Sequence, residues 1–192
     1  MAGSTKLLTS SGGGVILTPA SNIASDVTVN IPPVNGTLVN TGSTGQVTQT
    51  MLSTNVAGNG PSFSAYQSGA QGVTLNTATK VIFQTKDWDT ASCFDNSTNY
   101  RFTPTVAGYY QINAGVGIGS TPTTVYTLIY KNGSVWTGTY LTASTVQTST
   151  SGIVFLNGST DYVEIYTQIG SSQNLLNQRI QTYFNAAMIR SA

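Results

Sequence analysis

The alternation of apolar and polar positions is most regular in residues 100–116. Pro104 and Gly108 mark a turn there, and Pro104 suits a strand end because it cannot donate a hydrogen bond to a ladder. Beyond the turn every second position is apolar, and the positions between are polar or glycine. The apolar positions are Tyr110, Ile112, Ala114 and Val116. Because successive side chains of a strand point to opposite faces, the segment predicts a strand, a corner and a second strand with one buried face.

Strand signals separated by turn residues recur from residue 61 onward. Asn132-Gly133 predicts a tight hairpin, because these residue types accept the left-handed backbone that such a turn requires. Residues 153–156 form a continuous apolar run, which predicts a strand buried on both faces. The other strand candidates are residues 63–66, 81–83, 125–130, 135–140, 162–166 and 181–190. We therefore predict an all-β fold, an antiparallel sandwich or jelly roll.

Residues 1–60 differ from the rest of the chain. Residues 1–14 are small and polar, and we expect them to be flexible or ordered only by a partner. The short β candidates that follow are residues 15–17, 27–31 and 38–39. They are too few and too short to close a core alone. The segment is either a disordered linker or, in the interpretation we favour, an intertwined β collar to which three chains contribute. We predict an attachment segment at residues 1–60 and a head domain at residues 61–192.

Charged residues make up only 7% of the 192 residues, against about 25% in typical soluble domains. A surface so poor in charge lacks a usual guard against association, so we expect a homo-oligomer. The net charge is +1 and the basic residues are scattered, which argues against nucleic-acid binding. The single Cys excludes an internal disulfide framework. No apolar run approaches the length of about 20 residues that spans a membrane, and no secretion signal is apparent.

The sequence lacks several residue types that most active sites use, and we expect no enzymatic activity. It has no His, which removes the commonest general base. Asp87, Asp89 and Asp95 are the only clustered acids, and they are either solvated loop acids or, with Asn96, oxygen ligands of a calcium ion. Cys93 has no His partner and is expected to be a small buried side chain. No other metal and no cofactor is expected.

Trp88 and Trp136 are the two tryptophans and the candidate partner-binding residues. Tyr126, Tyr130 and Tyr140 lie in or near the same predicted hairpin as Trp136. One interpretation places the tryptophans in the core or in a subunit interface. In the other they are exposed and stack on a sugar or a protein partner, because aromatic rings give a large rigid contact at little entropy cost.

Residues 61–192 resemble a C1q-like domain, the jelly-roll head shared with the tumour necrosis factor superfamily. The matching segments are Phe63-Ser64-Ala65, Val81-Ile82-Phe83, Phe102-Thr103-Pro104, Gly108-Tyr109-Tyr110, Lys131-Asn132-Gly133, Asp161-Tyr162-Val163 and Tyr183-Phe184-Asn185-Ala186. Thr160 and Ala186 stand where glycine is usual, and no collagen repeat precedes the head. The resemblance implies a jelly roll, three copies around an axis and binding through exposed loops.

Residues 12–43 resemble a short module of structural proteins of tailed bacteriophages, often fibre-like tail proteins. Together the two resemblances imply a virion protein whose trimeric head adheres to a host surface glycan or protein as part of a tail fibre. Residues 1–60 would then bind other virion proteins. The alternative is a capsid decoration protein, because the chain is short for a fibre. A depolymerising enzyme is a third reading, which the absence of His and the scarcity of acids oppose.

Overall fold

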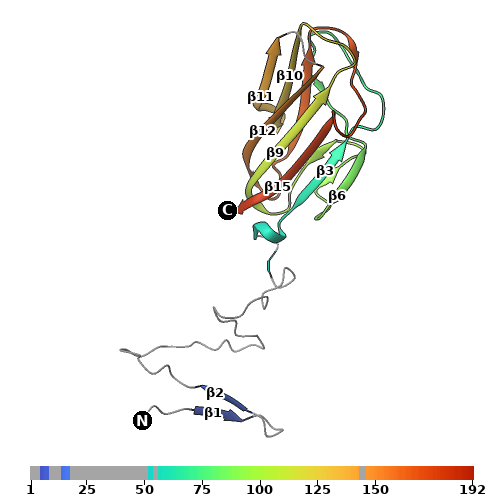
Figure 1. Cartoon of the computed structure of the whole chain (residues 1–192). Coiled ribbons are helices and arrows are strands. Elements are labelled where there is room, and N and C mark those ends of the chain that lie inside the picture. Colours follow the sequence, from blue (N-terminus) through green and yellow to red (C-terminus); the bar gives the residue numbers. More distant parts are fainter. Residues whose placement is uncertain (1–4, 9–13, 18–51, 54–55, 143–145) are drawn as a thin grey trace. The chain divides into compact units, whose positions relative to one another are not determined.

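The computed structural model describes residues 5–8, 14–17, 52–53, 56–142 and 146–192. The chain divides into two units, Met1–Ser43 and Thr44–Ala192. In the first unit, β1 (Thr5–Leu8) pairs antiparallel with β2 (Gly14–Leu17), as Figure 1 shows. The strand predicted at residues 15–17 is confirmed. The candidates at residues 27–31 and 38–39 lie outside the described residues.

The expectation that residues 1–14 are flexible or ordered only by a partner is wrong for residues 5–8. Thr5–Leu8 pairs with a strand of the same chain. The sequence hid this strand because its apolar run, Leu7-Leu8, is too short to display a period of two.

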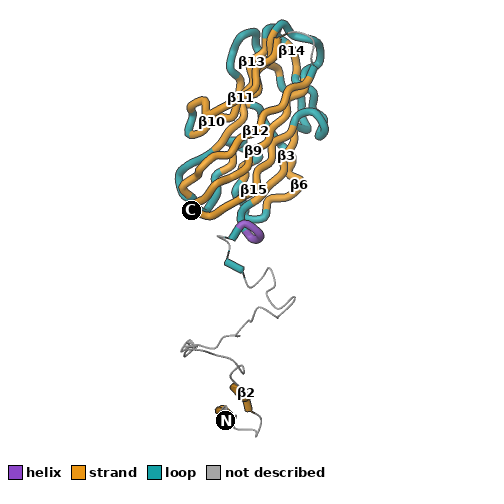
Figure 2. The backbone as a smooth tube through the Cα atoms, turned by 60° about the vertical axis from the view of Figure 1, so that its left-hand side comes forward, coloured by secondary structure: helices purple, strands orange, loops and turns teal. Residues whose placement is uncertain are grey.

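The second unit is a sandwich of two antiparallel sheets (Figures 1 and 2). The first sheet has the order β12 (Gln147–Asn157), β9 (Ala107–Gly117), β15 (Tyr183–Ser191), β3 (Ser62–Tyr66) and β6 (Thr85–Asp89). The second has the order β11 (Ser134–Thr142), β10 (Thr124–Lys131), β13 (Val163–Ile169), β8 (Arg101–Phe102) and β7 (Phe94–Asp95), with β5 (Thr79–Lys80) also pairing with β13. Neighbours in each sheet are mostly distant in sequence, so the chain crosses between the sheets as in a jelly roll. The all-β prediction is confirmed.

Two short elements complete the described part of this unit. A single 3-10 turn, η2 (Ala57–Asn59), precedes β3. A separate two-stranded ladder joins β4 (Gly72–Val73) to β14 (Gln173–Asn174). Among the described residues, no helix has the length and apolar character needed to cross a membrane.

Strand β9 has the predicted pattern. Its apolar positions are completely buried, and they are Tyr110, Ile112, Ala114 and Val116. The predicted hairpin joins β10 to β11 through Asn132 and Gly133, whose φ angles of 51° and 80° lie in the left-handed region. These two residue types accept that backbone at low cost, which fixes the register of the hairpin.

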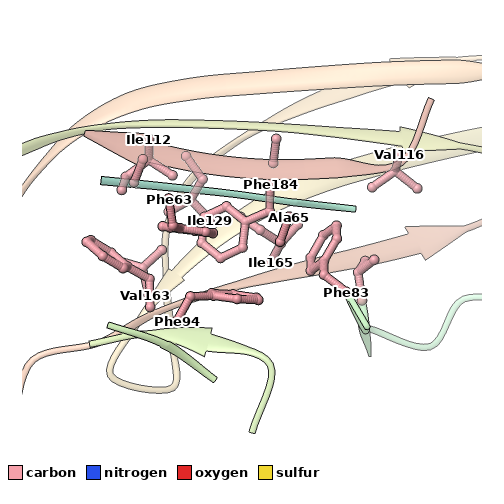
Figure 3. Packing of buried hydrophobic residues seen from close by; sticks show 14 of the residues in the cluster. Phe63, Ala65, Phe83, Phe94, Ile112, Val116, Ile129, Val163, Ile165 and Phe184 are labelled. Carbon is pink, nitrogen blue, oxygen red and sulfur yellow. The ribbon is translucent and has the colours of Figure 1, made fainter. Parts of the chain in front are cut away.

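The core between the sheets is centred on phenylalanine rings (Figure 3). The Phe63 ring stacks on the Phe94 ring with centroids 4.4 Å apart, and it meets the Phe184 ring edge-on at 4.8 Å. Phe102 stacks on Phe63 from a further strand, with centroids 4.9 Å apart. The two sheets therefore share one aromatic cluster with Phe63 at its middle.

The prediction of a strand at residues 81–83 is wrong. Val81 and Phe83 are completely buried, but the backbone there runs between β5 and β6 without a strand ladder. The Val81 N–H donates to the Ile165 carbonyl, whereas the Ile82 N–H donates to the side-chain oxygen of Gln71. At Ile82 the Gln71 side chain therefore takes the place that a partner strand would have in a ladder.

The prediction that residues 153–156 are buried on both faces is also wrong. Val154 and Leu156 face the core and are completely buried, whereas Ile153 is 54% exposed and Phe155 is 38% exposed. Both exposed side chains lie on the side of the sheet that faces away from the core. The apolar run therefore marks a strand with a buried face and a second apolar face that the single chain leaves open.

Candidate interaction surface

The outer side of the first sheet carries a group of exposed apolar side chains over β12, β9 and β15. Phe155 lies directly opposite Tyr109 in the ladder, and their ring centroids are 5.4 Å apart. Ile153 lies opposite Gln111, which lies in turn opposite Ala187 of β15. We call this surface the apolar sheet face, and its members are Tyr109, Ile153, Phe155, Ala187 and Ile189.

Amide side chains border the apolar sheet face and bond to one another. The Gln111 amide nitrogen donates to the side-chain oxygen of Asn113 at 3.2 Å, and the Asn113 amide donates to that of Asn185 at 3.0 Å. Strands β9 and β12 contain no charged residue, and β15 contains only Arg190. Covering this face would therefore bury few charges, and its amides already have partners.

The neighbouring edge of the sandwich is formed by two strands that contain no charged residue. Strands β11 and β12 each end a sheet, and neither contains Pro, Lys, Arg, Asp or Glu. The two lie beside each other in Figure 2, and they line a polar depression with Thr137, Gly138, Thr139, Ser149, Thr150 and Ser151. Soluble proteins usually protect long edge strands with charges, Pro or a covering element. Within β11 and β12 the first two devices are missing, which favours a covering partner.

The tryptophans lie on the surface of the single chain, so of the two alternatives, core or subunit interface, the core is wrong and the subunit interface stays a prediction. Trp136 is 52% exposed and Trp88 is 50% exposed. The Lys131 ammonium lies 5.8 Å from the Trp136 ring centre and 5.7 Å from that of Phe155, which places Trp136 beside the apolar sheet face. Trp88 lies on β6, opposite Ser64, at the other edge of the first sheet. The structure therefore does not bring the two tryptophans together.

Asp87 and Asp89 are each engaged by separate protein donors. Asp87 forms an ion pair with Arg179 at 2.9 Å and accepts a hydrogen bond from the Ser64 hydroxyl at 3.0 Å. Asp89 forms an ion pair with Lys86 at 3.1 Å, and it accepts the backbone N–H groups of residues 93 and 94. These contacts hold β6 to the first sheet and to the following loop.

Asp95 caps the loop that follows it. Its carboxylate accepts the backbone N–H groups of Ser97, Thr98 and Asn99, and these hydrogen bonds lower the pKa of Asp95 far below its usual value. The Asn96 amide points elsewhere and donates to the Gln84 carbonyl. Across the part of the chain that the structure describes, no three His, Cys, Asp or Glu side chains converge as ion ligands.

Cys93 lies in the core, as expected. Burial raises the pKa of its thiol, since the low-polarity surroundings disfavour the thiolate. A buried thiol with a raised pKa is a poor nucleophile, so Cys93 acts as an apolar packing residue.

The caps at Asp95 and Asp161 predict a loss of stability in acid. Hydrogen bonds lower the pKa of both carboxyl groups, with that from Asn132 the largest contribution at Asp161. A depressed folded pKa stabilises the native state fully above the unfolded value of about 4, and this stabilisation is lost progressively as the pH falls from that value through the lower folded pKa. We expect Asp95→Ala to lower the melting temperature at pH 7, and this difference to shrink at about pH 3. Scanning calorimetry measures both, and Asn96→Ala is the control whose effect should not change with pH. An equal Asp95→Ala effect at both pH values would contradict the assignment.

The sequence did not reveal the apolar sheet face. The apolar run predicts that Ile153 and Phe155 are buried, and the sequence around Tyr109 and Ile189 does not indicate that these side chains are exposed. One observation could have found the surface: residues 147–157 contain no charge in a strand whose alternate positions, Val154 and Leu156, already suffice for one buried face.

The fold defined by this sandwich is the jelly roll of tumour necrosis factor-like proteins. The chain is similar to murine APRIL, with a TM-score of 0.54 and 10% identity over 67% of this chain and 98% of that one. It is similar to Eiger TNF from S. frugiperda, with a TM-score of 0.54 and 11% identity over 69% and 92%. It is also similar to the PRD1 vertex protein P5, with a TM-score of 0.54 and 15% identity over 68% and 97%. No protein-family model matches the sequence, and no curated protein matches it.

Proposed function

We propose that this chain is a homotrimeric structural protein of a bacteriophage virion whose head adheres to the host surface. In this proposal residues 61–192 form the head, and residues 1–60 attach it to other virion proteins. The tumour necrosis factor-like fold supports the proposal, and so does the likeness to a vertex protein, PRD1 P5. The main support is a pair of surfaces on one sandwich that carry few charges, the apolar sheet face and the edge formed by β11 and β12.

These two surfaces favour a closed ring of copies. The two surfaces are different patches of one molecule. If the β11–β12 edge of one copy covers the apolar sheet face of the next copy, the contact is heterologous. Heterologous contacts repeat around an axis, and they close when the rotation allows it. The resemblance to C1q-like and tumour necrosis factor-like heads supplies the number three. In such a ring Ile153, Phe155 and Trp136 would be covered, which accounts for their apolar character.

The proposed activity is binding and not catalysis. The sequence has no His, and the carboxylates of Asp87, Asp89 and Asp95 are each engaged by neighbouring donors. Three equal sites on one head bind a surface together more strongly than one site, because the second and third contacts form at high local concentration. Weak sites on each copy are therefore sufficient for adhesion.

A second candidate function is decoration of the capsid. The likeness to a vertex protein favours it, since a trimer with attachment arms could bind a capsid as well as a tail. The two candidates share the trimer and differ in the position of the protein on the particle.

Two measurements test the adhesion proposal. Immunogold labelling of intact particles should place this chain at the tail, and labelling over the capsid would instead support decoration. Purified full chain, added to host cells before the phage, should reduce adsorption in a dose-dependent way. A chain that labels the tail but leaves adsorption unchanged at saturating concentration would contradict the adhesive role.

A further inference from the structure

The outer side of the second sheet carries four tyrosines that neither the core nor the apolar sheet face uses. On β10 the buried positions are Val125, Thr127 and Ile129, so the alternate residues face outward. Their ladder partners on β11 and β13 face outward with them. We call this surface the tyrosine platform, and its members are Tyr126, Tyr130, Tyr140 and Tyr166.

The four rings form two contacting pairs. Tyr126 and Tyr140 lie directly opposite each other in the ladder, with ring centroids 4.6 Å apart. Tyr130 and Tyr166 are stacked, with centroids 4.0 Å apart and an interplanar angle of 24°. Tyr140 is 50% exposed, and the other three rings are partly buried. Each ring is thus held by a neighbour and loses little freedom when a ligand covers it.

The cross-strand row between Tyr126 and Tyr130 is low at β11 and carries Tyr166 at β13, where Tyr166 lies opposite Leu128. Gly138 of β11 lies opposite Leu128 of β10 in the ladder. A Cβ atom at Gly138 would come within 2.5 Å of a Leu128 methyl group and 2.7 Å of the Thr127 carbonyl, so no larger residue fits there. The platform is therefore low only at Gly138, between Tyr140 and the stacked pair of Tyr130 and Tyr166.

The platform carries almost no accessible charge. The Glu164 carboxylate at its border is buried and forms an ion pair with Lys80 at 2.7 Å. Tyr166 lies beside this pair, and burial, followed by the nearby Glu164 charge, raises the pKa of its hydroxyl. The hydroxyl therefore remains protonated, and it donates to the Glu164 carboxylate at 3.5 Å. Gln168 adds an amide in the same outward row as Tyr126.

We propose that the tyrosine platform binds the rings of a neutral carbohydrate. This inference names the ligand class of the adhesion proposed above and rests on it. Tyrosine offers a flat apolar ring for the C–H faces of a sugar and a hydroxyl for its polar groups. An uncharged ligand matches a surface with little free charge. Lys80 lies opposite Tyr166 but already pairs with Glu164, so an anionic ligand would have to compete with that carboxylate.

The contrast with the apolar sheet face supports a sugar and not another copy of the chain. The apolar sheet face exposes aliphatic side chains, Ile153 and Ile189, which have no polar group to satisfy a sugar hydroxyl. Beside the tyrosines the aliphatic residues are Leu128, which is partly buried, and Val135, which lies opposite Tyr130 and is 57% exposed. The four tyrosine rings still make up most of this surface. Aromatic side chains with polar groups beside them are the usual lining of a site that fixes the orientation of a polar ligand.

The test begins with the full chain on an array of neutral and anionic bacterial surface oligosaccharides. We expect binding to neutral members, and the strongest of them then serves as the probe in a fluorescence titration. Tyr140→Ala should weaken its affinity by about tenfold or more, as expected for the loss of a well-placed aromatic contact. Tyr140→Phe keeps the ring and should weaken affinity less. Leu75→Ala is the matched control, because Leu75 is 49% exposed in a loop outside the platform.

A second measurement avoids any substitution. In saturation-transfer NMR on the unmodified chain, irradiation of tyrosine ring protons should reduce the signals of the sugar C–H protons. The carbohydrate assignment is overturned if the array shows no binding or only anionic binding, or if Tyr140→Ala behaves like Leu75→Ala. If the platform binds no sugar but captures a host protein, and this capture requires the tyrosines, the ligand is a protein and not a carbohydrate.

Failure of this inference can be distinguished from failure of the proposed function. If the Tyr140→Ala variant blocks phage adsorption as well as the unmodified chain does, the adhesive function is retained and the tyrosine platform is not the adhesion site. If the platform binds sugar but the chain never reduces adsorption, the carbohydrate site remains and the adhesive role fails.

Discussion

Replacing Ile153 and Phe155 together by Lys should convert the proposed trimer into a folded monomer. Both side chains are exposed on the apolar sheet face of the single chain, so the substitutions leave its core intact. In the ring, each Lys would lie uncompensated in an apolar contact, and burying an unpaired charge costs several kcal/mol. A loss of about 4 kcal/mol per contact weakens association about a thousandfold. Sedimentation equilibrium at micromolar concentration should therefore show the mass of one chain instead of three.

The control for this experiment is Leu75→Lys. Leu75 is about as exposed as the two target residues but lies in a loop away from the apolar sheet face, so this variant should remain trimeric. Circular dichroism should show unchanged β structure in every variant. A double Lys variant that remains a trimer would remove the apolar sheet face from the interface. An unmodified chain that sediments as a monomer would contradict the proposed trimer itself.

The sequence predicted the head well wherever local pattern and turn chemistry decide the structure. Strand β9 and the hairpin at Asn132 and Gly133 follow from a period of two and from residues that accept a positive φ. Val81 and Phe83 are completely buried, although the strand predicted there does not form. Their segment is held partly by the Gln71 side chain, and a contact with a side chain 11 residues earlier leaves no trace in local periodicity.

The candidate surfaces were harder to predict, because hydrophobicity does not tell which partner covers a residue. The run at residues 153–156 would look the same against a second layer of the same chain or against another copy. The sequence predicts burial on both faces without indicating what covers them, and Ile153 and Phe155 are open in the single chain. In the trimer that we propose they would be covered again. The tyrosine platform was partly visible in sequence, but Tyr166 joins it from β13 through pairing that only the fold supplies.

Replacing Phe63 by Ala should cost most of the stability of the head. The Phe63 ring is completely buried and contacts the rings of Phe94, Phe102 and Phe184, which come from both sheets. Substitutions of this kind cost about 3–5 kcal/mol, because they remove buried apolar surface and leave a cavity. Domains are stable by only about 5–15 kcal/mol in total. Urea unfolding should therefore show a much lower midpoint, with Phe63→Leu losing less.

Association would complicate this measurement, because a trimer that binds only folded copies raises the apparent stability of each copy. The substitution should therefore be compared in the chain that already carries Lys at positions 153 and 155, where folding is separated from assembly. In that background Phe63→Ala should still lower the urea midpoint strongly, whereas Leu75→Ala should not. If the two changes have equal effects, the aromatic cluster does not join the sheets. If Phe63→Ala is harmful only in the trimer, the cluster acts through assembly and not through the fold of one chain.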